Sequence, residues 1–252
     1  MKDSLLAKYV LVLDMDETLL RAFEGSESYN RFKKNSKRAF SQLEGRRLFK
    51  TTVQDVMEKR GKGVTSMFWF VKRPGLDNFL MWAQEKFAAV VIWSAGKKEY
   101  VYSILDVVFS DLKPPDLILT YDDIVYTKTY SSKPLEKVFE RLPIANIKNT
   151  IIVDDVLGNF YRANPFNGIL IPEYLPNSTG KSFLEEEYAL DDIIDWFENM
   201  NLNTFKDIRI FDKRTIFENF PIAEKIQPPP IDNASKFSVP ETYLEYQSIS
   251  EE

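Results

Sequence analysis

Short, continuous apolar runs recur along the chain, and they decide which fold class is open to it. A run without polar alternation is typical of a strand that is covered on both faces, as in a parallel sheet. Segments with the apolar spacing of one helix face lie between the runs. Alternating strands and helices predict an α/β fold. The expected strands are YVLVL (9–13), SMFWFV (66–71), FAAVVIW (87–93), DLILT (116–120), TIIV (150–153) and GILI (168–171).

The expected helices cover residues 74–87, 97–109, 133–142 and 182–200. Pro74 suits the first turn of the first of them, because proline has no amide hydrogen to leave unpaired there. Ser182 and Glu185 have the spacing of a capping box at the start of the last one.

Residues 21–65 interrupt the alternation, because they show no strong strand pattern and are rich in basic residues. We therefore expect a small insertion at about 21–65, between the first two strands of a domain spanning 1–204. Residues 205–252, which include three prolines at 228–230, are expected to form an extension that is docked or partly disordered. The basic residues of the insertion are Arg31, Lys33, Lys34, Lys37, Arg38, Arg46, Arg47 and Lys50, and Glu44 is the acid among them.

The composition excludes several kinds of chemistry. The chain contains no histidine and no cysteine, so imidazole bases, thiolate nucleophiles and metal sites built from either residue are absent. The net charge of −5 demands neither a nucleic-acid nor a membrane partner. The first ten residues do not resemble a signal peptide, and no apolar run is long enough to cross a membrane. We expect an intracellular protein, nuclear or cytoplasmic, that does not bind membranes.

Three of the apolar runs finish in groups that can carry out chemistry. Ligands of parallel α/β sheets bind beyond the carboxyl ends of the strands. Once the runs lie side by side, these groups should therefore meet, although they are far apart in the sequence. They are Asp14 and Asp16 after residues 9–13, Ser94 after 87–93, and Asp154 and Asp155 after 150–153.

Carboxylates that gather in one place repel each other unless a cation lies between them. Oxygen ligands without histidine or cysteine suit Mg²⁺, which takes one or two carboxylates together with substrate phosphate. A free carboxylate beside the metal can attack phosphorus and form an aspartyl phosphate. A second carboxylate can protonate the leaving oxygen and later take a proton from water. The pattern predicts metal-dependent phosphoryl transfer.

Each residue also has a simpler interpretation when it is taken alone. Asp-x-Asp is common in turns, Ser94 could cap the helix that follows it, and Lys133 could be a surface lysine. An EF-hand loop starting at Asp14 is excluded, because Leu19 stands where its glycine is required. The order of these residues, each at a strand end or a helix start, favours the catalytic interpretation.

The segment DMDETL (14–19) after an apolar strand resembles the first motif of the haloacid dehalogenase superfamily. More narrowly, it is similar to the small single-domain phosphatases of the RNA polymerase II C-terminal domain and their NLI-interacting-factor-like relatives. The resemblance implies a Rossmann-like, three-layer α/β fold with a parallel sheet and a small insertion after the first strand. Further matching segments are VKRPGLDNFL (71–80), VVIWSAGKKEYVYSILDVV (90–108), SSKPLEKV (131–138) and IIVDDVLGNFYRANPFNGILIPEY (151–174).

The resemblance also implies roles for individual residues. Asp14 would be the nucleophile and a metal ligand. Asp16 would be the general acid/base, and its main-chain carbonyl would also bind the metal. Thr18 would orient the loop. The remaining implied roles are phosphoryl binding by Ser94 and Lys133, metal binding by Asp154 and Asp155, and substrate contact by Arg73.

This chain departs from the family pattern in two places. Many small members have Asp-Asn where Asp154 and Asp155 stand, and many have threonine where Ser94 stands. Aspartate in place of asparagine keeps an oxygen ligand for the metal, and serine in place of threonine keeps the hydroxyl group. Lys128 competes with Lys133 for the role of the motif lysine, and Leu135 favours Lys133 because the family pattern is Lys-x-Leu.

The stretch between Ser94 and Lys133 is too short for a large lid domain, and an open site favours a phosphorylated protein or peptide over a metabolite. We expect a Mg²⁺-dependent serine/threonine phosphoprotein phosphatase. The basic run would guide an acidic substrate or would simply be a solvated helix face. The alternatives are a nucleotide or polynucleotide-end phosphatase, a non-catalytic phosphopeptide-binding module, and a small-molecule phosphatase capped by residues 21–65.

Overall fold

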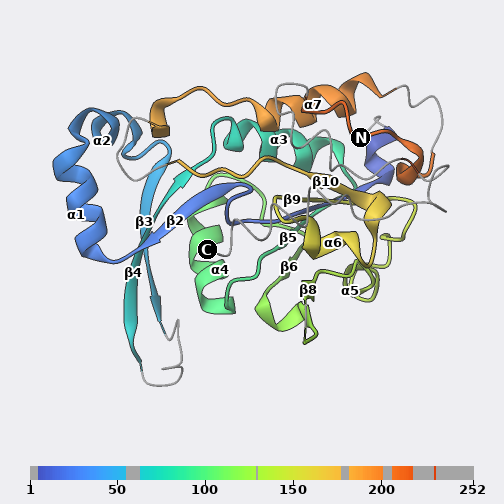
Figure 1. The fold of residues 1–252 in the computed structure, drawn as a ribbon, viewed down its shortest axis with the longest axis horizontal. Helices are drawn as coiled ribbons and strands as arrows, with labels where there is room; N and C mark the ends of the chain where they lie inside the picture. Colours follow the sequence, from blue (N-terminus) through green and yellow to red (C-terminus); the bar gives the residue numbers. More distant parts are fainter. Residues whose placement is uncertain are drawn as a thin grey trace.

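The protein is built around a five-stranded parallel sheet. The computed structural model describes residues 5–54, 63–128, 130–176, 182–200, 206–217 and 230. The strand order is β10-β9-β1-β5-β6 (Figure 1). The α/β prediction is therefore confirmed. The strands are β1 (Val10–Leu13), β5 (Ala89–Trp93), β6 (Leu117–Leu119), β9 (Thr150–Asp154) and β10 (Gly168–Leu170).

The register of this sheet aligns the ends of its central strands. Leu13, the last residue of β1, pairs with Ile92 of β5 on one side and with Val153 of β9 on the other. The amide of Asp14 then donates to the carbonyl of Val153 at 2.9 Å. The residues that follow β1, β5 and β9 therefore leave the sheet together at its carboxyl edge.

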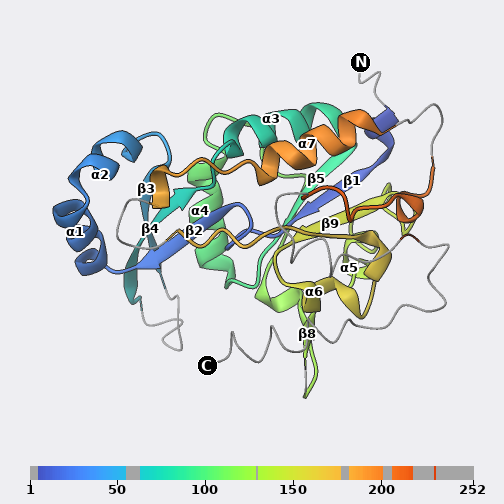
Figure 2. The same ribbon diagram turned by 45° about the horizontal axis from the view of Figure 1, so that its top comes forward.

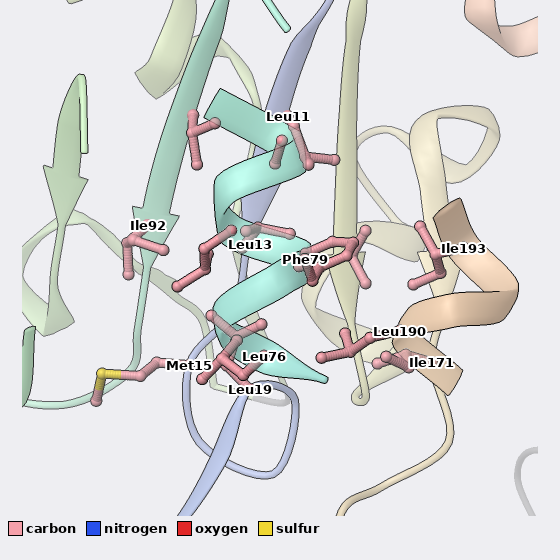
Figure 3. Close-up of a cluster of buried hydrophobic side chains, with 14 of the residues drawn as sticks. Leu11, Leu13, Met15, Leu19, Leu76, Phe79, Ile92, Ile171, Leu190 and Ile193 are labelled. Atoms are coloured by element: carbon pink, nitrogen blue, oxygen red, sulfur yellow. The ribbon is translucent and has the colours of Figure 1, made fainter. Parts of the chain in front are cut away.

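Helices cover both faces of the sheet, which explains why its strands are continuously apolar. One face packs against α3 (Leu76–Lys86), α4 (Lys98–Val108) and α7 (Ala189–Asn199). Figure 3 shows Leu11 and Leu13 of β1 in one hydrophobic cluster with Phe79 of α3. The other face packs against α5 (Glu136–Phe139) and α6 (Leu157–Tyr161). The result is the predicted three-layer arrangement.

The insertion between β1 and β5 forms a second, antiparallel sheet with the order β2-β4-β3. The run 66–71 lies in its central strand, β4, so our assignment of this run to the parallel sheet was wrong. Residues 21–65 also contain strands that we did not expect. Residues 55–62 lie outside the described part. The elements are β2 (Leu20–Glu24), α1 (Ser26–Asn35), α2 (Lys37–Leu43), β3 (Leu48–Gln54) and β4 (Thr65–Lys72).

Aromatic side chains form the core of this insertion. Trp69 of β4 is 1% exposed and stacks on Phe23 and Phe32, with ring centroids 4.3 and 5.0 Å away. Its indole N–H donates to Ser28 Oγ at 2.8 Å. Figures 1 and 2 both place α1 and α2 at the end of the insertion that lies away from the five-stranded sheet.

Two expected helices are shorter than the sequence pattern indicated. The helix predicted at 133–142 is reduced to α5 (Glu136–Phe139). The helix predicted at 182–200 begins only at Ala189, so the capping box at Ser182 was wrong. Glu187 accepts a hydrogen bond from the Ala189 amide at 3.0 Å, close to the true start of α7. The segment before it forms a short 3-10 turn at Ser182–Leu184.

The described part of the C-terminal extension, residues 206–217, packs on the domain. The Tyr9 hydroxyl donates to the Lys206 carbonyl at 2.6 Å, and the Ile208 amide donates to the Lys148 carbonyl at 2.8 Å. Ile208 and Phe217 are buried in the main hydrophobic core. The other residues of the expected extension, apart from 230, lie outside the described part, so the division at residue 205 stays a prediction. Among the described residues, no helix combines the length and the apolar character that a bilayer crossing requires.

Candidate active site

Three carboxylates meet at the carboxyl edge of the parallel sheet. Asp14 follows β1, while Asp154 and Asp155 lie at the end of β9, and one oxygen of each lies within 4.8 Å of the others. Burial raises the pKa of Asp14 well above its usual range, and the charges of Asp154 and Asp155 raise it further against the opposing effect of Lys133. Burial and the charge of Asp154 raise the pKa of Asp155 to about 7. This cluster therefore favours bound protons or a cation.

Lys133 lies between two of these carboxylates. Its ammonium group is fully buried and donates to Asp14 Oδ1 and, at 2.7 Å, to Asp154 Oδ2. Burial alone would lower the pKa of Lys133, but Asp14 and Asp154 outweigh that effect and raise it. Lys128 is exposed and lies in the hairpin just before Lys133. The structure thus brings Lys133, and not Lys128, into the cluster.

Asn159 of α6 holds Asp154 in place, and the sequence interpretation missed it. Its side-chain amide donates to both oxygens of Asp154, at 2.8 and 3.1 Å. The Val156 amide donates to Oδ1 of the same carboxylate at 2.9 Å. The Asn159 carbonyl also accepts from the Lys133 amide at 2.6 Å. The only sequence signal was its position five residues after Asp154, which does not indicate a contact by itself.

Thr18 binds Asp155 through both functions of its hydroxyl group. The hydroxyl donates to Asp155 Oδ1 at 2.8 Å and accepts from the Asp155 amide at 3.2 Å. Glu17, between Asp16 and Thr18, has a positive φ of 57°. Such a backbone is strained for a residue with a side chain, at a cost of about 1–3 kcal/mol. The loop is thus held tightly where it turns from β1 into β2.

Asp16 lies apart from the three-carboxylate cluster and has its own partners. Ser94 Oγ donates to Asp16 Oδ2 at 3.3 Å, and the Tyr100 hydroxyl donates to Oδ1. Burial raises the pKa of Asp16, and both hydrogen bonds oppose that shift. Tyr100 is a second residue that the sequence interpretation missed. Helix α4 begins at Lys98, so Ser94 does not cap it, and its Oγ accepts from the Gly96 amide instead.

Arg73, which we expected to contact substrate, is buried and held by protein groups. It is 1% exposed, and its guanidinium donates twice to Glu187 at 2.8 Å. It also donates to the Thr18 carbonyl at 2.9 Å and to the Pro172 carbonyl at 2.7 Å. With these partners the guanidinium lies beneath the loop that carries Asp16 and Thr18, where it supports the backbone.

The oxygen atoms of the carboxylate cluster fit a hard divalent cation. Asp14, Asp154 and Asp155 supply carboxylate oxygens alone, and the sequence has no histidine or cysteine to add a softer ligand. The raised pKa values of Asp14 and Asp155 are what unshielded, buried carboxylates would show. A cation at this point would relieve both effects.

Comparison with known proteins agrees with this geometry. The family model described as "NLI interacting factor-like phosphatase" matches residues 9–209. No curated protein matches the chain. One similar solved structure is that of Fcp1, an essential RNA polymerase II CTD phosphatase (TM-score 0.52, 16% identity). Another is the fission yeast CTD phosphatase Fcp1-R271A bound to beryllium fluoride (TM-score 0.53, 15% identity).

The two alignments cover 90% and 94% of this chain, but 65% and 69% of the Fcp1 chains, so this chain spans about two thirds of their length. At such low identity, the structural likeness shows the fold alone. The family model, in contrast, matches well over half of the chain. The chain therefore belongs to the NLI interacting factor-like phosphatase family.

Proposed function

We propose that this protein is a Mg²⁺-dependent serine/threonine phosphoprotein phosphatase that works through an aspartyl phosphate. The observation that carries the proposal is the separation of two carboxylates, the buried Asp14 and the half-buried Asp16, into different surroundings. Asp14 pairs with Lys133, whereas Asp16 accepts hydrogen bonds from Ser94 and Tyr100. With a cation beside Lys133, Asp14 would be charged in spite of its burial, whereas burial raises the pKa of Asp16 and lets it hold a proton. A charged and a protonated carboxyl group are the pair that nucleophilic attack with acid catalysis requires.

Asp14, Asp154 and Asp155, with the main-chain carbonyl of Asp16, would hold the Mg²⁺ ion. When bound, it neutralises negative charge on the phosphoryl oxygens and on the carboxylates. The remaining chemistry can be assigned to side chains of the chain itself.

In the first step, an oxygen of Asp14 attacks phosphorus and the bond from phosphorus to the seryl or threonyl oxygen breaks. Asp16 gives its proton to that leaving oxygen. In the second step, water attacks phosphorus, the bond to Asp14 breaks, and Asp16 takes the proton from the water. Lys133 and Ser94 would hold the phosphoryl oxygens in both steps, since the ammonium and hydroxyl groups are donors beside Asp14 and Asp16.

A phosphorylated protein segment suits this site better than a metabolite does. Between Ser94 and Lys133 the described chain holds only α4, β6 and short turns and strands, with no separate domain to enclose a small substrate. The similar solved structures are named as phosphatases of the RNA polymerase II C-terminal domain. We infer a substrate of that kind, a flexible segment with phosphoserine or phosphothreonine.

The test is a panel assay in Mg²⁺ that compares phosphoserine peptides, 5′-phosphorylated oligonucleotides and sugar phosphates, with Asp14→Asn as the blank. We expect turnover of the peptides that is lost in Asp14→Asn and abolished by EDTA. Activity that survives in Asp14→Asn would show that Asp14 is not the nucleophile. Preference for oligonucleotides, with a steep salt dependence, would support the polynucleotide alternative. Peptide binding without turnover would indicate a binding module.

A further inference from the structure

Tyr100 reaches the acid/base candidate from outside the motif residues. It lies in the first turn of α4, and its hydroxyl donates to Asp16 Oδ1. Its ring packs edge-on against Phe68 of β4, with centroids 5.1 Å apart. A β-carbon added at Gly96 would lie 2.6 Å from Cδ1 of this ring. The absence of a side chain at Gly96 is therefore what allows the ring to lie here.

The two oxygens of Asp16 are held unequally. Oδ1 accepts from Tyr100, whose phenol has a rigid ring seated between Gly96 and Phe68. Oδ2 accepts only a long hydrogen bond of 3.3 Å from Ser94. Ser94 is also the hydroxyl that we assign to the phosphoryl group, so it would turn away from Oδ2 when substrate binds. Tyr100 would then be the remaining hydrogen-bond donor to this carboxyl group among those that the structure describes.

We propose that Tyr100 is a positioning residue that fixes Asp16 so that Oδ2 carries the catalytic proton. This inference rests on the proposed function and deepens it. In the first step the proton leaves Oδ2 for the seryl oxygen as the bond from phosphorus to that oxygen breaks. In the second step Oδ2 takes a proton from water as the bond from water oxygen to phosphorus forms. Tyr100 keeps its own proton throughout and donates to Oδ1.

This assignment gives the insertion a part in the chemistry. Phe68 belongs to β4 of the antiparallel sheet, yet it contacts the ring that orients Asp16. The motif strands alone would leave Asp16 free to rotate about its side-chain bonds. The antiparallel sheet would thus support the proton donor through one aromatic contact, without touching substrate.

The test compares substrates that differ in their need for a proton. A phosphoserine peptide has a poor leaving group, whereas 2,4-dinitrophenyl phosphate releases a stable phenolate that needs none. We expect Tyr100→Phe to lower kcat for the peptide by about 10- to 100-fold, the range for a lost hydrogen bond to a charged group. KM for the peptide should stay within about twofold. For dinitrophenyl phosphate, kcat/KM reports only the first step, which needs no proton donor, and should stay within about threefold. Tyr102→Phe, an exposed tyrosine on the same helix, is the matched control and should change neither.

An equal loss of kcat/KM on both substrates, or no loss on the peptide, would overturn the role of Tyr100. The double variant Tyr100→Phe/Asp16→Asn should turn over the peptide as slowly as Asp16→Asn alone, because Tyr100 acts through Asp16. A further tenfold loss in the double variant would also overturn it. Wild-type protein that fails to dephosphorylate the peptide at all would instead contradict the proposed function.

Phe68→Leu is a second variant in case Tyr100→Phe does not fold. It keeps the Tyr100 hydroxyl but loosens the ring. A smaller loss of the same kind, confined to the peptide, is expected. Equal losses on both substrates would count against the proposal.

Discussion

The carboxyl edge of the parallel sheet and the antiparallel insertion are stabilised in opposite ways. At the sheet edge, charged groups are buried and paired with each other, as Lys133 is with Asp14 and Asp154. In the insertion, the buried groups are aromatic rings around Trp69, and most of the basic residues are exposed. Buried charges cost free energy unless they are paired, so an arrangement like the first is expected where chemistry needs it. The comparison shows that paired charges hold the sheet edge together, whereas aromatic packing stabilises most of the insertion.

Arg47 shows that the two regions are nevertheless joined. It belongs to the basic run, but it is only partly exposed and donates to the Lys72 and Phe183 carbonyls, at 2.9 and 3.1 Å, and to the Tyr174 hydroxyl at 2.8 Å. The Tyr174 amide in turn donates to the Glu17 carbonyl at 2.6 Å. The basic run is therefore not a single functional unit, because at least one of its members is structural.

Asp16→Asn gives the largest expected effect and tests the reactive region. An amide cannot hold the catalytic proton, so we expect peptide turnover to fall by about 10²–10⁴-fold with little change in stability. The measurement is kcat for a phosphoserine peptide, with thermal unfolding of the same preparation. An unchanged rate would mean that another group transfers the proton. The sheet edge would then no longer differ from the insertion by holding the acid/base residue.

Trp69→Leu tests the packing region. Removing a fully buried ring that stacks on Phe23 and Phe32 should lower the free energy of unfolding by about 2–4 kcal/mol. Turnover of dinitrophenyl phosphate should stay within about threefold of wild type at a temperature where the variant is folded. Urea denaturation and the rate together check this. A large loss of rate with little loss of stability would show that Trp69 contributes to the reaction and not mainly to packing.

Metal affinity should depend on pH at the sheet edge. The pKa of Asp155 is raised to about 7 and that of Asp14 is raised as well, so below about pH 7 the protein holds protons that a cation must displace. Mg²⁺ affinity should therefore fall as pH falls through 7, by up to about tenfold per pH unit. Calorimetry at pH 6 and 8, in buffers of different ionisation enthalpy, would measure both the change in Mg²⁺ affinity and the number of protons released on binding. Affinity that is independent of pH would contradict the protonated cluster.

Charge reversal in the basic run gives the smallest expected effect. Lys33, Lys34 and Lys37 are exposed on α1 and α2, at the end of the insertion away from the parallel sheet (Figure 2). If they guide an acidic phosphopeptide, changing all three to glutamate should lower kcat/KM by roughly three- to tenfold at low salt and less at high salt. Lys148→Glu, at an exposed lysine outside the insertion, is the control. No change would identify the run as a solvated helix face.

Much of the parallel sheet could be predicted from the sequence, because the apolar runs are local and continuous. The insertion could not. β4 is also a continuous apolar run, and nothing within it distinguishes a strand of the parallel sheet from the centre of an antiparallel one. Its assignment depends on β2 and β3, which pair with it from a distance along the chain. The start of α7 at Ala189 was missed for a similar reason, since Glu187 binds both the Ala189 amide and the distant Arg73.

The sequence by itself determined the chemistry that is open to this protein. Without histidine or cysteine, and with acids directly after apolar strands, it points to oxygen ligands and a carboxylate nucleophile. Only the tertiary structure decided which side chains hold those acids. It places Asn159 against Asp154, Tyr100 against Asp16, and Arg73 against the Thr18 carbonyl. Strand periodicity is set by neighbours along the chain, whereas a hydrogen bond between distant residues exists only once packing has brought both partners together.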